Sequence, residues 1–153
     1  MNLFVEIVRP NDWNWVLLLH VAGAMILVGG TLAAASALVF ARGDAGTLRL
    51  GYWSLLAVGL PGYVLMRIGA EWLASKEGYT AKDAPEPTWI GIGWGIADAG
   101  LPLLVIALIV GGIGVYRLRN GKGTRLLKVT MVISVVLLAA YVIAIWAMAG
   151  KPG

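Results

Sequence analysis

The sequence predicts an all-α polytopic membrane protein, an up-down-up-down bundle of four transmembrane helices. Of its 153 residues, 59% are hydrophobic and 13% are charged, whereas soluble domains carry roughly 25% charged residues. The apolar residues form four long runs, at residues 15–40, 50–74, 89–116 and 126–149. Each run is near or above the ~20 residues that a helix needs to cross a bilayer. The connections are short, so we expect residues 1–153 to form one membrane domain without a soluble module.

The first run follows a turn at Pro10, Asn11 and Asp12, which is typical of a helix N-terminus. The residues before it lack the basic segment of a secretory signal, and the run is too long for the apolar part of one. We therefore expect a retained helix. This helix contains His20, the only histidine in the chain.

The second run is interrupted by Gly59, Pro61 and Gly62, and we expect a bend at the proline. Before it, residues 41–47 predict a tight hairpin between helices. After it, residues 75–88 form the longest and most polar connection, in which two prolines, at positions 85 and 87, prevent a helix from continuing.

The third run carries Pro102, where we again expect a bend, and it contains the small residues Gly91, Gly95 and Ala99 at spacings of four. Small residues let helices approach closely inside lipid, so glycine-rich helix faces predict packing within the chain, in a homodimer or in a larger membrane complex. The last connection, residues 117–125, is basic and rich in glycine, and the fourth run follows it.

Positive charge predicts the orientation of the bundle. The first and third connections and the residues beside them hold seven lysines and arginines, whereas the other side of the membrane would hold four. Because basic residues collect on the cytoplasmic side, we expect a multi-pass protein of the inner (plasma) membrane with both termini extracytoplasmic. The net charge of +4 is explained by this topology, and we expect the lipid bilayer, and no nucleic acid, as a partner.

Apart from Lys128, which we count with the third connection, few charges lie inside the apolar runs, and all of them fall at a similar depth. His20, Arg67, Glu71 and Asp98 each lie in the half of the bundle that is predicted to be extracytoplasmic. Tyr63, Arg67 and Glu71 share one stripe of the second helix at spacings of four, and Gly91, Gly95, Asp98 and Pro102 share one stripe of the third. If both stripes face inward, Arg67 bridges the two carboxylates, because an unpaired buried charge costs several kcal/mol.

Two interpretations of these residues stay open. In the first, the five residues His20, Tyr63, Arg67, Glu71 and Asp98 form a site for a small ligand or a proton, since ionisable groups inside a membrane often mark such pathways and histidine titrates near neutral pH. In the second, Arg67 and Glu71 reach the lipid headgroups and Asp98 only accepts hydrogen bonds.

Metal and haem sites have less support. A bis-histidine haem b site would need His20 from two copies of the chain. Copper(I) accepts imidazole and thioether ligands, which makes His20, Met25 and Met66 candidates, but Met25 is five residues from His20 and so lies on a different helical face. The chain has no cysteine, which excludes disulfides and thiol chemistry. No serine lies in register with a base, so we do not expect an enzyme.

The segment LLLHVAGAMILVGG at residues 17–30 resembles the first helix of a family of small bacterial four-helix proteins, described as predicted integral membrane proteins of unknown function. That helix is similar to the leucine-histidine-glycine-glycine opening in the membrane domain of copper-resistance D proteins. The segments LPGYVLM (60–66) and TWIGIGWGIADAG (88–100) resemble the second and third helices of the same family. The resemblance implies a four-helix fold but no reaction. It places three residues on the family pattern: His20, Gly29 and Gly30.

These observations predict a small integral membrane protein with a polar intramembrane site near the extracytoplasmic side, which binds a small ligand or a proton and acts as a transporter component. The alternative from a different class is a non-catalytic accessory subunit of a larger membrane complex. Its support is the set of glycine-rich faces and the gathering of Trp13, Trp15, Trp72, Trp89, Trp94 and Trp146 at one end of the bundle.

Overall fold

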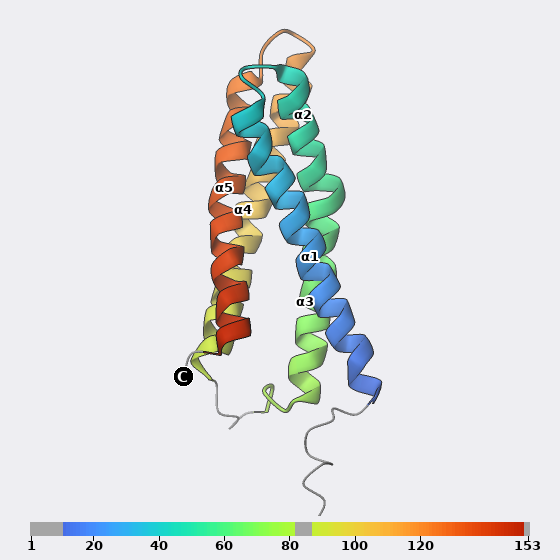
Figure 1. Ribbon diagram of the computed structural model, residues 1–153. Helices are drawn as coiled ribbons and strands as arrows, with labels where there is room; N and C mark the ends of the chain where they lie inside the picture. Colours follow the sequence, from blue (N-terminus) through green and yellow to red (C-terminus); the bar gives the residue numbers. More distant parts are fainter. Residues whose placement is uncertain (1–10, 82–86, 152–153) are drawn as a thin grey trace, which may run out of the picture.

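The computed structural model (Figure 1) describes residues 11–81 and 87–151, with side chains from Trp15 onward. The first crossing is helix α1 (Asn11–Phe40), and the second joins α2 (Ala45–Ser54), the π-helical turn η1 (Leu55–Gly59) and α3 (Leu60–Lys76). The third and fourth crossings are α4 (Thr88–Leu118) and α5 (Thr124–Gly150). Four helical segments are long and apolar enough to span a membrane, and no strand occurs in the described residues. The predicted all-α four-helix architecture is confirmed.

The crossings form two hairpins. Helix α1 packs along α3, and α4 packs along α5, while the hairpins contact each other mainly through α1 against α5 and through α2 against α4 and α5. Figure 1 shows that they lie close together at the end that carries the connections after α1 and α4, and that they diverge toward the other end. We call these the basic end and the terminal end, the latter being where α1 begins and α5 finishes.

The hairpins meet around a narrow apolar core. Leu27, Leu48, Leu104 and Leu137 are almost completely buried, whereas large apolar side chains on every crossing are exposed, as expected for a surface that contacts lipid. Hydroxyl groups in the core donate to helix carbonyls: the Thr130 hydroxyl lies 3.3 Å from the Ala107 carbonyl oxygen, which ties α5 to α4. Such bonds satisfy buried polar groups that have no water to bind.

Glycines bring α1 and α3 into backbone contact. An alanine methyl at position 69 would lie 2.5 Å from the backbone nitrogen of His20, and one at position 23 would lie 2.7 Å from the Cα of Met66. Gly62 approaches the backbone of Leu27 equally closely. These three glycines therefore serve packing within the chain, as close approach of helices in lipid requires.

A different set of residues packs on α4 than the sequence suggested. Gly95 and Ala99 are exposed, and a methyl at position 95 would meet no atom within 4 Å. The buried stripe instead contains Gly93, Ala97 and Gly100. The face of α4 with Gly95, Asp98 and Pro102 therefore lies on the exposed side of the helix. Asp98 reaches Arg67 on α3 from the edge of that face.

The interruption in the second crossing is a π-helical turn. At its end, the Leu60 amide donates to the Leu55 carbonyl, a bond to the fifth preceding residue. Pro61 follows at once. A proline has no amide hydrogen and its ring crowds the preceding turn of a helix, so a wider turn before it relieves the conflict. Pro102, by contrast, lies inside α4, which remains helical from end to end.

The first connection turns within a few residues. Arg42 and Gly43 have positive φ angles of 43° and 97°, and Asp44 then caps helix α2 by accepting a hydrogen bond from the Thr47 amide at 2.7 Å. The hydroxyl of Thr47 also donates to the Asp44 carboxylate, and these bonds hold the pKa of Asp44 below its usual value of 3.8. The cap defines where the second crossing begins at the basic end.

Candidate functional site

His20, Arg67, Glu71 and Asp98 lie at one level of the bundle, whereas the other charged residues of the spanning helices lie near the helix ends. Arg67 lies nine residues before the end of α3 at Lys76, and Asp98 lies ten residues after the start of α4 at Thr88. At 1.5 Å per residue, both are roughly 14 Å from the terminal end. A 31-residue helix centred on a hydrocarbon core of about 30 Å would place Asp98 roughly 7 Å inside the core.

Arg67 joins carboxylates from two helices. Its Nη2 lies 2.9 Å from Oε1 of Glu71, one turn further along α3, and its Nη1 lies 2.9 Å from Oδ1 of Asp98 on α4. The sequence predicted this bridge on the condition that the stripes of both helices face inward, and the bridge forms although the stripe with Gly95, Asp98 and Pro102 lies on the exposed side of α4. We refer to Arg67, Glu71 and Asp98 as the charged cluster.

One of the two contacts is an ion pair without a well-directed hydrogen bond. Nη1 of Arg67 is buried, and despite its closeness to Asp98 it makes no hydrogen bond of acceptable geometry in the described structure. Attraction between the charges depends on distance and holds the pair together, but the N–H group is left without an aligned acceptor.

Tyr63 ties the two hairpins together beside the charged cluster. It is buried, and its hydroxyl donates to the Ala97 carbonyl on α4 at 3.0 Å. This bond reaches the backbone next to Asp98 and does not reach a charged group. Tyr63 thus fixes the distance between α3 and α4, and it positions Asp98 opposite Arg67.

His20 lies at the same level but makes a different contact. Its Nδ1 lies 3.0 Å from the Met66 carbonyl oxygen on α3. A carbonyl only accepts, so Nδ1 carries the hydrogen and Nε2 is left to bind elsewhere. Among the described residues, no hydrogen bond or ion pair joins His20 to the charged cluster. The structure therefore brings together Tyr63, Arg67, Glu71 and Asp98, and it places His20 beside Met66, the residue before Arg67.

The charged cluster is open on one side. The side chains of Arg67, Glu71 and Asp98 are 30%, 50% and 64% exposed. Two carboxylates and one guanidinium leave a formal charge of −1 when all are ionised. Such a charge inside a membrane is expensive if it faces lipid. The exposed side of Asp98 is therefore stable only in contact with water, a bound cation or another protein.

A further polar group, which the sequence analysis did not single out, lies near this level. The hydroxyl of Tyr141 on α5 is buried and has no hydrogen-bond partner within the described structure. It faces Gly100, where an added methyl would lie 3.1 Å from the hydroxyl oxygen. The tyrosine stands in an otherwise apolar stretch of α5, residues 135–145, and only its burial reveals that it belongs near the cluster.

The residues considered for copper do not form a shared site. Met25 is exposed on α1, whereas Met66 is buried on α3. Over the part of the chain that the structure describes, no group of three or more histidine, cysteine, aspartate or glutamate side chains is placed to hold a metal ion.

Comparisons with protein-family models, curated proteins and solved structures returned no match for this chain. The resemblance of residues 17–30 to the copper-resistance D membrane domain stays a prediction.

Proposed function

We propose that this multi-pass membrane protein binds a proton or a small cationic ligand at the charged cluster and acts as a component of a transporter. The observation that carries the proposal is the pairing of one arginine with carboxylates from two helices at 2.9 Å each. Neutralising the remaining negative charge requires one positive charge, which a proton, an alkali-metal ion or an alkylammonium group supplies.

Unused hydrogen-bonding groups around the cluster support the same proposal. The Tyr141 hydroxyl lacks any partner among the described residues, and its oxygen can accept a hydrogen bond from an alkylammonium group or coordinate an alkali-metal ion. A buried polar group without a hydrogen bond costs about 1–3 kcal/mol. A bound polar ligand would recover part of that cost, and His20 Nε2 offers one more acceptor at the same depth.

Proton flux in proteoliposomes tests the proposal. Vesicles loaded with a pH-sensitive dye would be driven by a potassium diffusion potential, and we expect Arg67→Leu and Asp98→Asn each to reduce the protein-dependent flux at least about tenfold, because each removes a charge from the pathway. Thermal unfolding with sodium or ethylammonium chloride tests the cationic ligand, and we expect Asp98→Asn to abolish any stabilisation by these salts.

The matched controls remove the same kinds of charge, one arginine and one carboxylate, at positions outside the cluster. Arg125→Leu removes an exposed arginine at the basic end, and Glu77→Gln neutralises a carboxylate after α3. We expect both controls to behave like the unaltered protein. Wild-type flux and wild-type salt responses in both cluster variants would refute the proposed site.

The exposed face of Asp98 also favours the accessory-subunit alternative. A partner helix laid against Gly95, Asp98 and Pro102 would cover a charge that lipid does not solvate, and the small size of Gly95 would allow a close approach. Extraction in a mild detergent distinguishes the two functions. A partner protein recovered in fixed ratio supports the accessory role, and a monomer or dimer of this chain alone opposes it.

The proposed location of the site on the extracytoplasmic side follows from the charge distribution and is tested by labelling. The chain contains no cysteine, so single cysteines at Thr80 and Asn120, both exposed and in opposite connections, report orientation. A membrane-impermeant maleimide added to intact cells is expected to label the variant at position 80 and to spare the one at 120. Labelling of position 120 alone would show that the orientation of the protein is the reverse of the proposed one.

A further inference from the structure

A hollow at the basic end lies between α2 and α4, far from the charged cluster. It has a volume of about 460 Å³, and two arginines, Arg49 and Arg119, line it together with aromatic side chains from both helices. The aromatic residues are Tyr52, Trp53 and Tyr116, and the floor includes Gly112. No carboxylate lines this hollow, and neither guanidinium group has an ion pair or hydrogen bond with another described residue.

Tyr52 provides a second, independent indication of a ligand. Its side chain is buried, with the residue only 8% exposed, and no hydrogen bond to its hydroxyl occurs among the described residues. The hydroxyl is directed toward the hollow, because a methyl on Gly112 would lie 3.2 Å from its oxygen. Gly111 and Gly112 leave room for the ring, so the fold places a hydrogen-bond donor, without a partner, beside two arginines.

The chemistry of the hollow matches one type of ligand. Guanidinium groups pair with phosphate oxygens, a phenol donates to them, and tryptophan and tyrosine favour the headgroup level of a membrane. Gly112 and Val115 add an apolar surface one to two turns deeper along α4. Basic hollows between transmembrane helices bind anionic lipid headgroups for these reasons.

We propose that the hollow binds the phosphate of an anionic phospholipid, with Arg49 and Arg119 pairing with its oxygens and the Tyr52 hydroxyl donating to it. The glycerol and the first part of the acyl chains then lie along Gly112 and Val115 on α4. The site is independent of the charged cluster, which lies toward the opposite end of the bundle.

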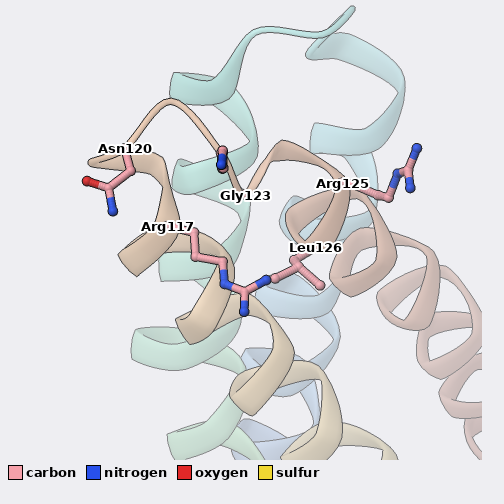
Figure 2. Close-up of a pocket in the computed structure, with 6 residues that line it drawn as sticks. Arg117, Asn120, Gly123, Arg125 and Leu126 are labelled. Carbon is pink, nitrogen blue, oxygen red and sulfur yellow. The ribbon is translucent and has the colours of Figure 1, made fainter.

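A second hollow at the same end provides the contrast. Arg117, Asn120, Arg125 and Leu126 are among the residues that line it. In Figure 2 the Arg117 side chain lies beneath the connection toward Leu126, whereas Arg125 points away from it and Asn120 points outward. Its polar groups diverge, so they do not surround one phosphate. Arg117 and Arg125 therefore serve as controls with the same charge at the same end of the molecule.

Thermal unfolding of the purified protein in neutral detergent tests the proposal with three probes: dioctanoyl phosphatidylglycerol, dioctanoyl phosphatidylcholine and inorganic phosphate. We expect only phosphatidylglycerol to raise the unfolding temperature in a saturable way, as a ligand of the folded state does. Arg49→Gln and Arg119→Gln are each expected to raise the half-saturating concentration about fivefold, since one such charge contributes about 1 kcal/mol.

The remaining variants distinguish binding in this hollow from general attraction of the anionic lipid to the basic end of the protein. Tyr52→Phe removes one oxygen without changing the packing, and we expect it to weaken the response at least about fivefold. Arg117→Gln and Arg125→Gln are expected to leave it unchanged. An equal response to phosphatidylcholine, an equal response to inorganic phosphate, or an equal loss in the control variants would each overturn the proposal.

Discussion

Replacing Gly23 by alanine is expected to lower the free energy of unfolding by about 3 kcal/mol, the upper part of the range for overpacking. The added methyl would lie 2.7 Å from the backbone carbonyl carbon of Leu65 and from the Cα of Met66. Backbone atoms do not move aside as a flexible side chain does, so α1 and α3 would have to separate. That separation would also lengthen the bond between His20 and Met66.

Gly29 is the matched control for this prediction, because it lies on the same helix and has no atom within 4 Å of an added methyl. Gly29→Ala is expected to leave stability unchanged or to raise it by up to about 1 kcal/mol through helix propensity. Unfolding in mixed micelles measures both variants. Equal stability of the two variants would show that the backbone contact at Gly23 does not hold α1 against α3.

Replacing Arg67 by leucine is expected to lower the free energy of unfolding by about 1–2 kcal/mol at neutral pH, because Glu71 and Asp98 would lose their cation. Breaking a fully buried ion pair costs more, about 3–5 kcal/mol, but this pair is partly exposed, with Asp98 64% exposed, and is screened accordingly.

A double-mutant cycle separates the ion pair from other effects of the substitution. Arg67→Leu combined with Asp98→Leu removes both charges, and its loss of stability is expected to be smaller than the sum of the two single losses by at least about 0.5 kcal/mol. Arg125→Leu again controls for the removal of a positive charge. Strict additivity would indicate that Arg67 and Asp98 do not interact in the folded protein.

Much of the fold follows from the sequence because a bilayer leaves few alternatives. Apolar runs of sufficient length must be helical to satisfy their backbone groups, and the observed helices extend each predicted run by only a few residues. The Arg67 bridge was predictable for a related reason. Equal depth and a spacing of four residues on α3 placed one arginine within reach of two carboxylates.

Which side of each helix faces the core could not be predicted in the same way. Helix α4 is apolar on nearly all sides, so no polar face marks its exterior, and Gly95 and Gly93 look equivalent in the sequence. Only the packing against α5, where Gly93 meets Met148, distinguishes them. The hollow near Arg49 depends in turn on the packing of α2 against α4, and the position of the unpartnered Tyr141 hydroxyl depends on the packing of α5 against α4.

The two hairpins diverge toward the terminal end, and the charged cluster is one of the contacts that join them there. Toward the basic end the hairpins meet through apolar core residues such as Leu48 and Leu127, whereas toward the terminal end α3 and α4 are joined by the Tyr63–Ala97 and Arg67–Asp98 contacts. Without the Arg67–Asp98 ion pair, the Tyr63–Ala97 hydrogen bond would be the remaining polar contact between α3 and α4 among the described residues, and we expect the hairpins to separate more easily at the terminal end.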